Sequence, residues 1–149
     1  MAIPLSKIWN TETNSLPPDW PLYSLDDNST VGMPIGPATY QMDQETVERY
    51  SKLMGVETAI YANMPARIAD VLRTTPTANA RMMLELFEPI RAGDICTLSG
   101  SVIALYVRRG KPYATYQVET RRSDGVLMDR LRKTVILSRK ELADKWTFL

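Results

Sequence analysis

The 149 residues of this chain include no histidine, so any proton transfer has to rely on other side chains. Histidine is the side chain whose unperturbed pKa best suits proton transfer near neutral pH, and it recurs in hydrolase sites and in most zinc sites. The sequence therefore disfavours those mechanisms, and we predict neither a metal site nor a bound cofactor. The side chains that we consider for catalysis are Glu57, Tyr61 and Asp70.

Composition indicates one domain of moderate size. The chain is 44% hydrophobic and carries a formal net charge of +1, which is enough apolar content for a real core. We find no apolar run long enough to span a bilayer and no secretory leader pattern, so we expect a cytoplasmic protein. Cys96 is the single cysteine, and its apolar strand context predicts a small buried residue rather than a nucleophile.

Residues 50–61 keep the frame of a known catalytic motif. They resemble the pattern Tyr-x-x-Leu-(Ser/Thr)-Gly-Asp-x-Asn-Pro-(Ile/Leu)-His of the MaoC-like family, which comprises R-specific enoyl-thioester hydratases and dehydratases. The matching residues are Tyr50, Leu53, Gly55 and Ile60. The positions of the catalytic Asp and His in that pattern hold Val56 and Tyr61. The resemblance thus implies a thioester-binding site and argues against the usual chemistry of the family.

The resemblance also implies which steps such a site would keep. In active members the Asp and His activate a water for addition to, or loss from, an enoyl thioester, and backbone N–H groups at the start of a central helix polarise the carbonyl. That polarisation would survive here at Asn63 and Met64. Val56 cannot transfer a proton. Tyr61 has an unperturbed pKa of about 10, which makes it a poor base at neutral pH.

Three functions follow from these substitutions. The first is a non-catalytic hotdog subunit that pairs with another hotdog chain, as a homodimer or a heteromer. The second is a rewired hydratase, dehydratase, thioesterase or isomerase in which Tyr61 donates a hydrogen bond and Glu57 or Asp70 is the base. The third is a module that binds an acyl-CoA, an acyl-carrier thioester or another apolar ligand. The alternative is that none of these side chains is catalytic. We then expect Tyr61 to be a packing residue, Glu57 to be solvated and Asp70 to pair with a neighbouring arginine.

The elements that position these residues follow from periodicity and turn residues. Asp43 is a helix N-cap and Gly55 a helix stop, which predicts a helix over residues 43–55. A second helix over residues 64–74 is apolar on most sides and is expected to be wrapped by a sheet. Strands are predicted over residues 39–42, 81–88, 95–108, 113–121 and a last run through Leu137, joined by turns at residues 89–94, 109–112 and 123–125.

Two helices followed by a meander of four strands predict an α+β domain. The order of residues in the second half also resembles MaoC-like domains: Pro89-x-x-Ala-Gly-Asp94, Val102, Arg109-Gly-Lys111, Val118, Asp124-Gly and Arg132. The resemblance covers about residues 39–138 and implies a single hotdog fold, a curved antiparallel sheet around the helix at residues 64–74. Gly100 is expected to let the longest strand bend. Residues 1–38 are predicted to be an irregular proline-rich arm and residues 139–149 a short tail with a helical turn.

Charge is unevenly distributed along the sequence. Residues 1–40 hold one lysine and four acids, whereas residues 108–140 hold ten Lys and Arg against Glu119, Asp124 and Asp129. The simplest interpretation is solvated strand faces. A functional interpretation is that Arg108, Arg109 and Lys111 bind the phosphates of coenzyme A or an acidic partner. The small overall charge and the apolar setting of the tyrosines argue against nucleic-acid binding.

Overall fold

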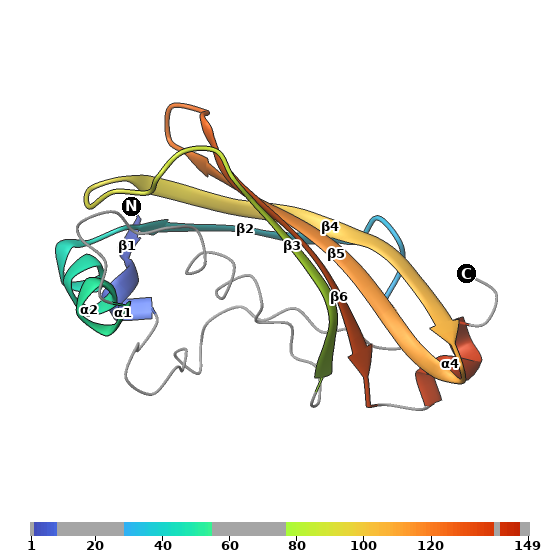
Figure 1. Cartoon of the computed structure of the whole chain (residues 1–149). Coiled ribbons are helices and arrows are strands. Elements are labelled where there is room, and N and C mark those ends of the chain that lie inside the picture. Colours follow the sequence, from blue (N-terminus) through green and yellow to red (C-terminus); the bar gives the residue numbers. More distant parts are fainter. Residues whose placement is uncertain (1, 9–28, 55–76, 139–140, 147–149) are drawn as a thin grey trace.

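The computed structural model describes residues 2–8, 29–54, 77–138 and 141–146. The described part consists mainly of one curved sheet (Figure 1). Its strands are β1 (Ile3–Pro4), β2 (Pro34–Gln41), β3 (Thr77–Leu86), β4 (Ile95–Arg108), β5 (Lys111–Arg122) and β6 (Leu127–Leu137). The described helices are α1 (Leu5–Ile8), α2 (Gln44–Met54) and α4 (Glu141–Trp146). The central helix predicted over residues 64–74 lies outside the described residues.

The described strands follow the order β1-β2-β4-β5-β6-β3, and among them only β1 and β2 run parallel. The predicted meander is confirmed for β4, β5 and β6, which tight turns connect. It is wrong for β3, which pairs with β6 and not with the next strand in the chain. The reason is that β2 already occupies the other edge of β4, so β3 takes the free edge beside β6. The described sheet has six strands, with β1 and β3 at its edges, and it is mixed because β1 and β2 are parallel.

The N-terminal segment is more regular than its prolines suggest. Residues 3–8 form β1 and α1, and β2 begins at Pro34 instead of at the predicted residue 39. Pro37 is accommodated because the pairing of β2 with β4 shifts register between Ile35 and Ala38, where no ladder hydrogen bond is needed. Leu5 and Ile8 are buried and extend the core beyond the sheet.

Asp43 caps α2, as predicted. Its carboxylate accepts hydrogen bonds from the hydroxyl groups of Ser6 and Thr46, and the Ser6 N–H donates to Oδ1 at 3.3 Å. Burial tends to raise the pKa of Asp43, but these hydrogen bonds outweigh it and lower the pKa. One side chain thus starts α2 and ties α1 to it.

Replacement of Asp43 by alanine is expected to lower the free energy of unfolding by about 1 to 2 kcal/mol, because a cap and the link to Ser6 are lost together. Urea denaturation followed by circular dichroism measures the change. Gln44→Ala is the matched control, since Gln44 is exposed and its side chain donates a hydrogen bond to the exposed Glu48 at 3.2 Å. Equal stabilities of the two variants would contradict the capping role.

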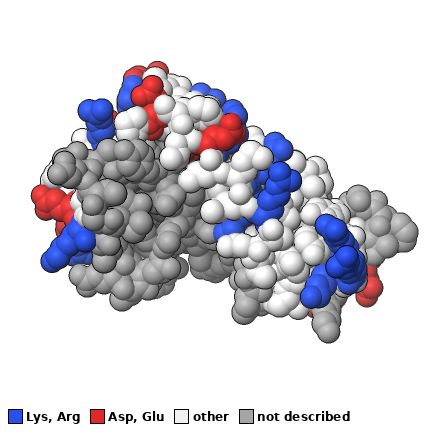
Figure 2. Space-filling model, viewed as in Figure 1, with Lys and Arg blue, Asp and Glu red and all other residues white. Residues whose placement is uncertain are grey.

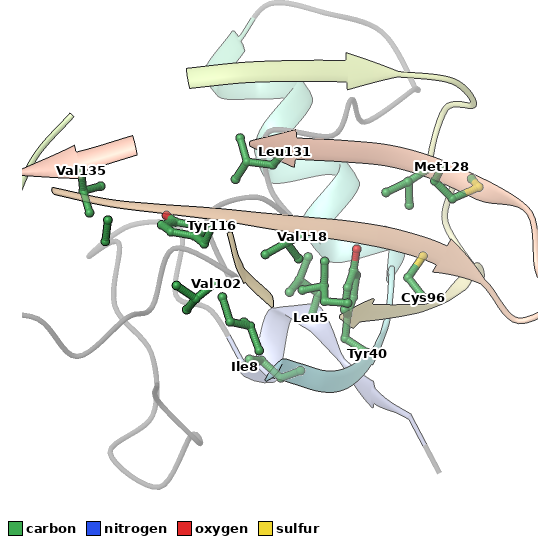
Figure 3. Close-up of a cluster of buried hydrophobic side chains, with 14 of the residues drawn as sticks. Leu5, Ile8, Tyr40, Cys96, Val102, Tyr116, Val118, Met128, Leu131 and Val135 are labelled. Atoms are coloured by element: carbon green, nitrogen blue, oxygen red, sulfur yellow. The ribbon is translucent and has the colours of Figure 1, made fainter. Parts of the chain in front are cut away.

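The core lies on one face of the sheet (Figure 3). Along β5 the buried residues Ala114, Tyr116 and Val118 alternate with less buried polar residues, as predicted. Leu131, Val135 and Leu137 of β6 continue the same face. At the far end, Leu142 and Trp146 of α4 are buried near β4 and β5, which confirms the helical turn in the tail. None of the helices described is long and apolar enough to cross a membrane.

Gly100 lies where β4 and β5 approach closely. The register irregularity of β4 falls at Ile103, between the pairs Val102–Tyr116 and Ala104–Thr115. At Gly100 the backbone of β5 comes so close that an added Cβ would lie 1.9 Å from the carbonyl oxygen of Gln117. Glycine is therefore needed there for the close approach of two strands.

Candidate functional site

The predicted motif is only partly described by the structure. Tyr50 and Leu53 lie on α2, at one end of the sheet. The other predicted site residues of this region lie outside the described residues: Val56, Glu57, Tyr61, Asn63, Met64 and Asp70. Their arrangement around a thioester remains a prediction.

The structure brings the three predicted phosphate-binding residues together. Arg108 and Lys111 are opposite each other where β4 and β5 end, and Arg109-Gly110 forms the two-residue turn between them. All three cations are exposed. We call Arg108, Arg109 and Lys111 the hairpin tip. It lies at the end of the sheet away from α2 (Figure 1), so the structure does not place it near the described part of the motif.

Most other cations of the basic segment are used within the sheet. Arg130 contacts Glu119 at 3.0 Å and Glu85 at 3.4 Å, and Arg122 contacts Asp124 at 2.7 Å. Figure 2 shows blue and red surfaces mixed at the upper end of the molecule, where the turn from β5 to β6 lies. The simpler interpretation of the charge, a solvated strand face, therefore holds for this part of the basic segment.

Sequence reasoning placed Cys96 in the core but missed the buried polar residues around it. Tyr40, Cys96, Thr120 and Asp129 come from β2, β4, β5 and β6 and expose at most 2% of their surface. We call these four residues the polar core cluster. Tyr40 is opposite Cys96, and Thr120 is opposite Asp129. Figure 3 shows Tyr40 and Cys96 side by side among apolar residues.

A sequence signal for Asp129 exists in the spacing of β6. Asp129 is two residues before Leu131 and six before Val135, so the alternation that buries those residues also buries Asp129. Lys133 lies on the same face and is buried, opposite Tyr116 of β5. The position of Asp129 in the alternation of β6 indicates that it is buried, whereas its charge suggests exposure to solvent.

Burial controls the ionisation of the polar core cluster. It raises the pKa of Asp129 to about 6, which the hydroxyl and backbone of Thr120 only partly oppose. Burial also raises the pKa of Cys96 to about 11 and that of Tyr40 well above its ordinary value. The Cys96 thiol is thus protonated near neutral pH, and the predicted burial of Cys96 is confirmed.

The polar core cluster can hold or release one proton near neutral pH. The hydroxyl groups of Tyr40 and Thr120 and the Oδ2 atom of Asp129 form no hydrogen bond of regular geometry with the described residues, so Thr120 lies close enough to Asp129 to influence its pKa without a well-formed bond. Tyr40 stays a hydrogen-bond donor, while Asp129 changes charge close to physiological pH. The part of the chain that the structure describes contains no cluster of His, Cys, Asp and Glu suited to a metal ion.

An exposed apolar surface follows β3, the edge strand beside β6. Four large apolar side chains are exposed there: Met82 at 60%, Met83 at 43%, Leu86 at 51% and Phe87 at 46%. We call these residues the β3 edge surface. The outer edge of β3 pairs with no other described strand, and a strand edge flanked by apolar side chains is a typical site for association with another chain.

Comparison with known proteins identifies the fold. No protein-family profile matches the sequence, and no curated protein sequence does so either. Solved structures do match. The (R)-hydratase from A. caviae involved in PHA biosynthesis gives a TM-score of 0.61 at 16% identity, covering 75% of this chain and 99% of the other. The MaoC-like dehydratase from Rhodospirillum rubrum gives 0.58 at 17% identity, covering 76% and 96%.

A third match is the C-terminally truncated HadBC (3R-hydroxyacyl-ACP dehydratase) complex from Mycobacterium tuberculosis. Its TM-score is 0.61 at 12% identity, over 74% of this chain and 99% of that one. The chain therefore has the hotdog fold of MaoC-like dehydratases and R-hydratases. This confirms the predicted hotdog fold, but the described sheet is mixed and not fully antiparallel as predicted, because β1 and β2 are parallel.

Proposed function

We propose that this chain is a MaoC-like hotdog subunit that binds an acyl thioester, carried by coenzyme A or by a carrier protein, and does not hydrate it unaided. The observation that carries the proposal is the fold of R-hydratases in a chain without histidine. The proposed motif positions Val56 and Tyr61 cannot together activate water at neutral pH. Backbone N–H groups at Asn63 and Met64 would still bind the thioester carbonyl, since this contact needs no particular side chain.

The subunit role is supported by the β3 edge surface. Exposed apolar side chains beside unpaired backbone groups suit pairing with a strand of a second hotdog chain. The HadBC structure from M. tuberculosis is itself a complex, which is consistent with such pairing here. A partner with an intact Asp and His would supply the proton transfer that this chain lacks.

The sequence of β3 also allows pairing with a second copy. The register with β6 places Arg81, Met83 and Glu85 on the outward face. If two β3 strands pair antiparallel about Met83, Arg81 of each copy lies opposite Glu85 of the other. Opposite charges in that arrangement stabilise the pair.

Substitution of Met83 by lysine is expected to weaken self-association by at least about tenfold, because the two introduced cations would face each other across the symmetry axis. Sedimentation equilibrium over a concentration series measures the dissociation constant. Ile103→Lys is the control, since Ile103 is exposed on β4 and away from β3. A parent chain that sediments as a monomer, or a Met83 variant that associates normally, would contradict self-pairing.

A rewired enzyme is the second candidate, and the buried Asp129 is the observation that favours it. A carboxyl group with a pKa of about 6 is tuned for proton transfer near neutral pH. In this alternative Tyr61 donates a hydrogen bond, and Glu57, Asp70 or Asp129 is the base.

Four substitutions separate the two candidates: Tyr61→Phe, Glu57→Gln, Asp70→Asn and Asp129→Asn. We expect all four variants and the parent to show equally little enoyl-thioester hydration and hydrolysis. Hydration is followed by ultraviolet absorbance and hydrolysis by thiol release. Parent activity that falls at least about a hundredfold in one variant would assign the base and establish the rewired enzyme.

A further inference from the structure

Three buried polar atoms of the polar core cluster form no hydrogen bond of regular geometry with the described residues. They are the Tyr40 hydroxyl, the Thr120 hydroxyl and Asp129 Oδ2. Tyr40 and Thr120 expose 0% of their surface, and Asp129 exposes 2%. A buried polar group without a partner costs free energy, and folded proteins leave few such groups. Three of them in one cluster therefore indicate a shared partner that the described residues do not supply.

The register of the sheet brings these side chains together on its core face. Thr120 of β5 is directly opposite Asp129 of β6. Tyr40 of β2 is opposite Cys96 of β4 (Figure 3), and Cys96 is a diagonal neighbour of Thr120, because Thr120 itself pairs with Leu98. After burial and the neighbouring Cys96, the charge of Asp129 also raises the pKa of Tyr40. Asp129 therefore lies within electrostatic range of Tyr40, across the two strands between them.

The hydrogen-bonding capacity of the three atoms matches that of one hydroxyl oxygen. Burial raises the pKa of Tyr40, so its hydroxyl keeps its proton and can donate it. The Thr120 hydroxyl can also donate, whereas an ionised Asp129 accepts. A hydroxyl oxygen accepts two hydrogen bonds and donates one, so a single such group satisfies all three atoms. A carbonyl oxygen has no hydrogen to donate to Asp129.

A bridging group also accounts for the relation between Thr120 and Asp129. The Thr120 side chain is close enough to lower the pKa of Asp129 against the larger effect of burial. Neither the Thr120 hydroxyl nor Asp129 Oδ2 forms a hydrogen bond of regular geometry. Two polar groups in such an arrangement are commonly linked through a third oxygen.

We propose that the polar core cluster is a binding site for one hydroxyl oxygen, supplied by a trapped water molecule or by the alcohol group of an apolar ligand. Buried waters make about three hydrogen bonds of this kind. The neighbouring side chains of the same face, Leu98, Val118 and Leu131, are buried and apolar. Apolar walls with a few convergent polar atoms are typical of small-molecule sites. The inference goes beyond the proposed function, since it involves no thioester.

The test has two measurements that separate the two sources. Magnetic relaxation dispersion of isotopically labelled water counts the water molecules that stay bound for long times. Nuclear magnetic resonance titration compares the affinities of hexanol, hexyl chloride and hexylamine. Both use the parent chain, the double variant Tyr40→Phe with Thr120→Val, and Tyr116→Phe. The last is the matched control, because Tyr116 is a buried tyrosine of the same face that lies outside the cluster.

If water is the source, we expect the parent and Tyr116→Phe to hold one long-lived water more than the double variant. If a ligand alcohol is the source, the parent should bind hexanol at least about tenfold more tightly than hexyl chloride, and only the double variant should lose that preference. This comparison needs the parent alone, so it does not depend on the folding of a variant.

Two results would overturn the proposal. The first is an unchanged water count in the double variant together with no preference of the parent for hexanol. The second is tighter binding of hexylamine than of hexanol at the cluster, which would assign the site to a cation instead of a hydroxyl group. Both results leave the proposed binding of a thioester untouched.

Discussion

Gly100→Ala is expected to destabilise the protein by more than about 4 kcal/mol, which would prevent folding of a marginally stable domain. The added methyl group would lie 1.9 Å from the carbonyl oxygen of Gln117 and 2.8 Å from the Cα of Val118. Both contacts are with backbone, so no side-chain rotation relieves them. Relief requires separation of β4 and β5 in the middle of the sheet, where both strands have neighbours on their other sides.

Urea denaturation of Gly100→Ala and Gly93→Ala measures this effect. Gly93 has a φ of 97° but no atom within 4 Å of an added Cβ, so its substitution costs only the strain of the backbone, about 1 to 2 kcal/mol. A Gly100 variant that is as stable as the Gly93 variant would show that the two strands are not in the close contact described.

The second large effect concerns Asp129 and pH. Its pKa in the folded chain is about 6, above the ordinary value of about 3.9, so the folded chain binds this proton more tightly than the unfolded chain. The stability contributed by Asp129 is therefore complete below about pH 4 and is lost as the pH rises to about 6. The total loss is about 3 kcal/mol for a shift of this size.

Asp129→Asn should remove that dependence. Relative to the parent, the variant is expected to gain stability as the pH rises from about 4 to about 7, because its amide cannot ionise. Tyr40 and Cys96, the other titratable members of the polar core cluster, stay protonated over this range. The measurement is the difference in unfolding free energy between variant and parent at each pH.

Asp124→Asn is the matched control for the pH experiment. Asp124 is exposed, and its hydrogen bond with Arg122 lowers its pKa, so its loss should produce no gain of stability at neutral pH. A variant-to-parent difference at Asp129 that does not change with pH would show that the carboxyl is not buried as described.

The sheet was predictable where local signals and packing agree. The alternation at Ala114, Tyr116 and Val118 specifies the core face of β5, and the short turns at Arg109-Gly110 and Asp124-Gly125 specify its neighbours. The place of β3 was not predictable from its own residues, because it depends on which strand edges the other strands leave free. The structure of residues 3–8 depends on contacts with the chain near Tyr40 and Asp43, which no local pattern reveals.

The candidate site was predictable to a smaller extent. The resemblance in motif spacing led to the hotdog fold, although Val56 and Tyr61 stand where the pattern has Asp and His. Asp129 was missed because a carboxylate in a strand suggests a solvent-facing position, although its parity places it in the core. The hairpin tip was predicted as one group, while its position at the end of the sheet away from α2 required the structure.

The central claim is that this chain binds a thioester and does not hydrate it alone. The most direct test is one titration of the purified parent chain with crotonyl-CoA and with crotonyl-loaded carrier protein, in which binding heat and the loss of enoyl absorbance are recorded on the same samples. We predict saturable binding of a thioester with no loss of absorbance above that of buffer. Steady hydration by the pure chain, or no binding of either thioester, would contradict the claim.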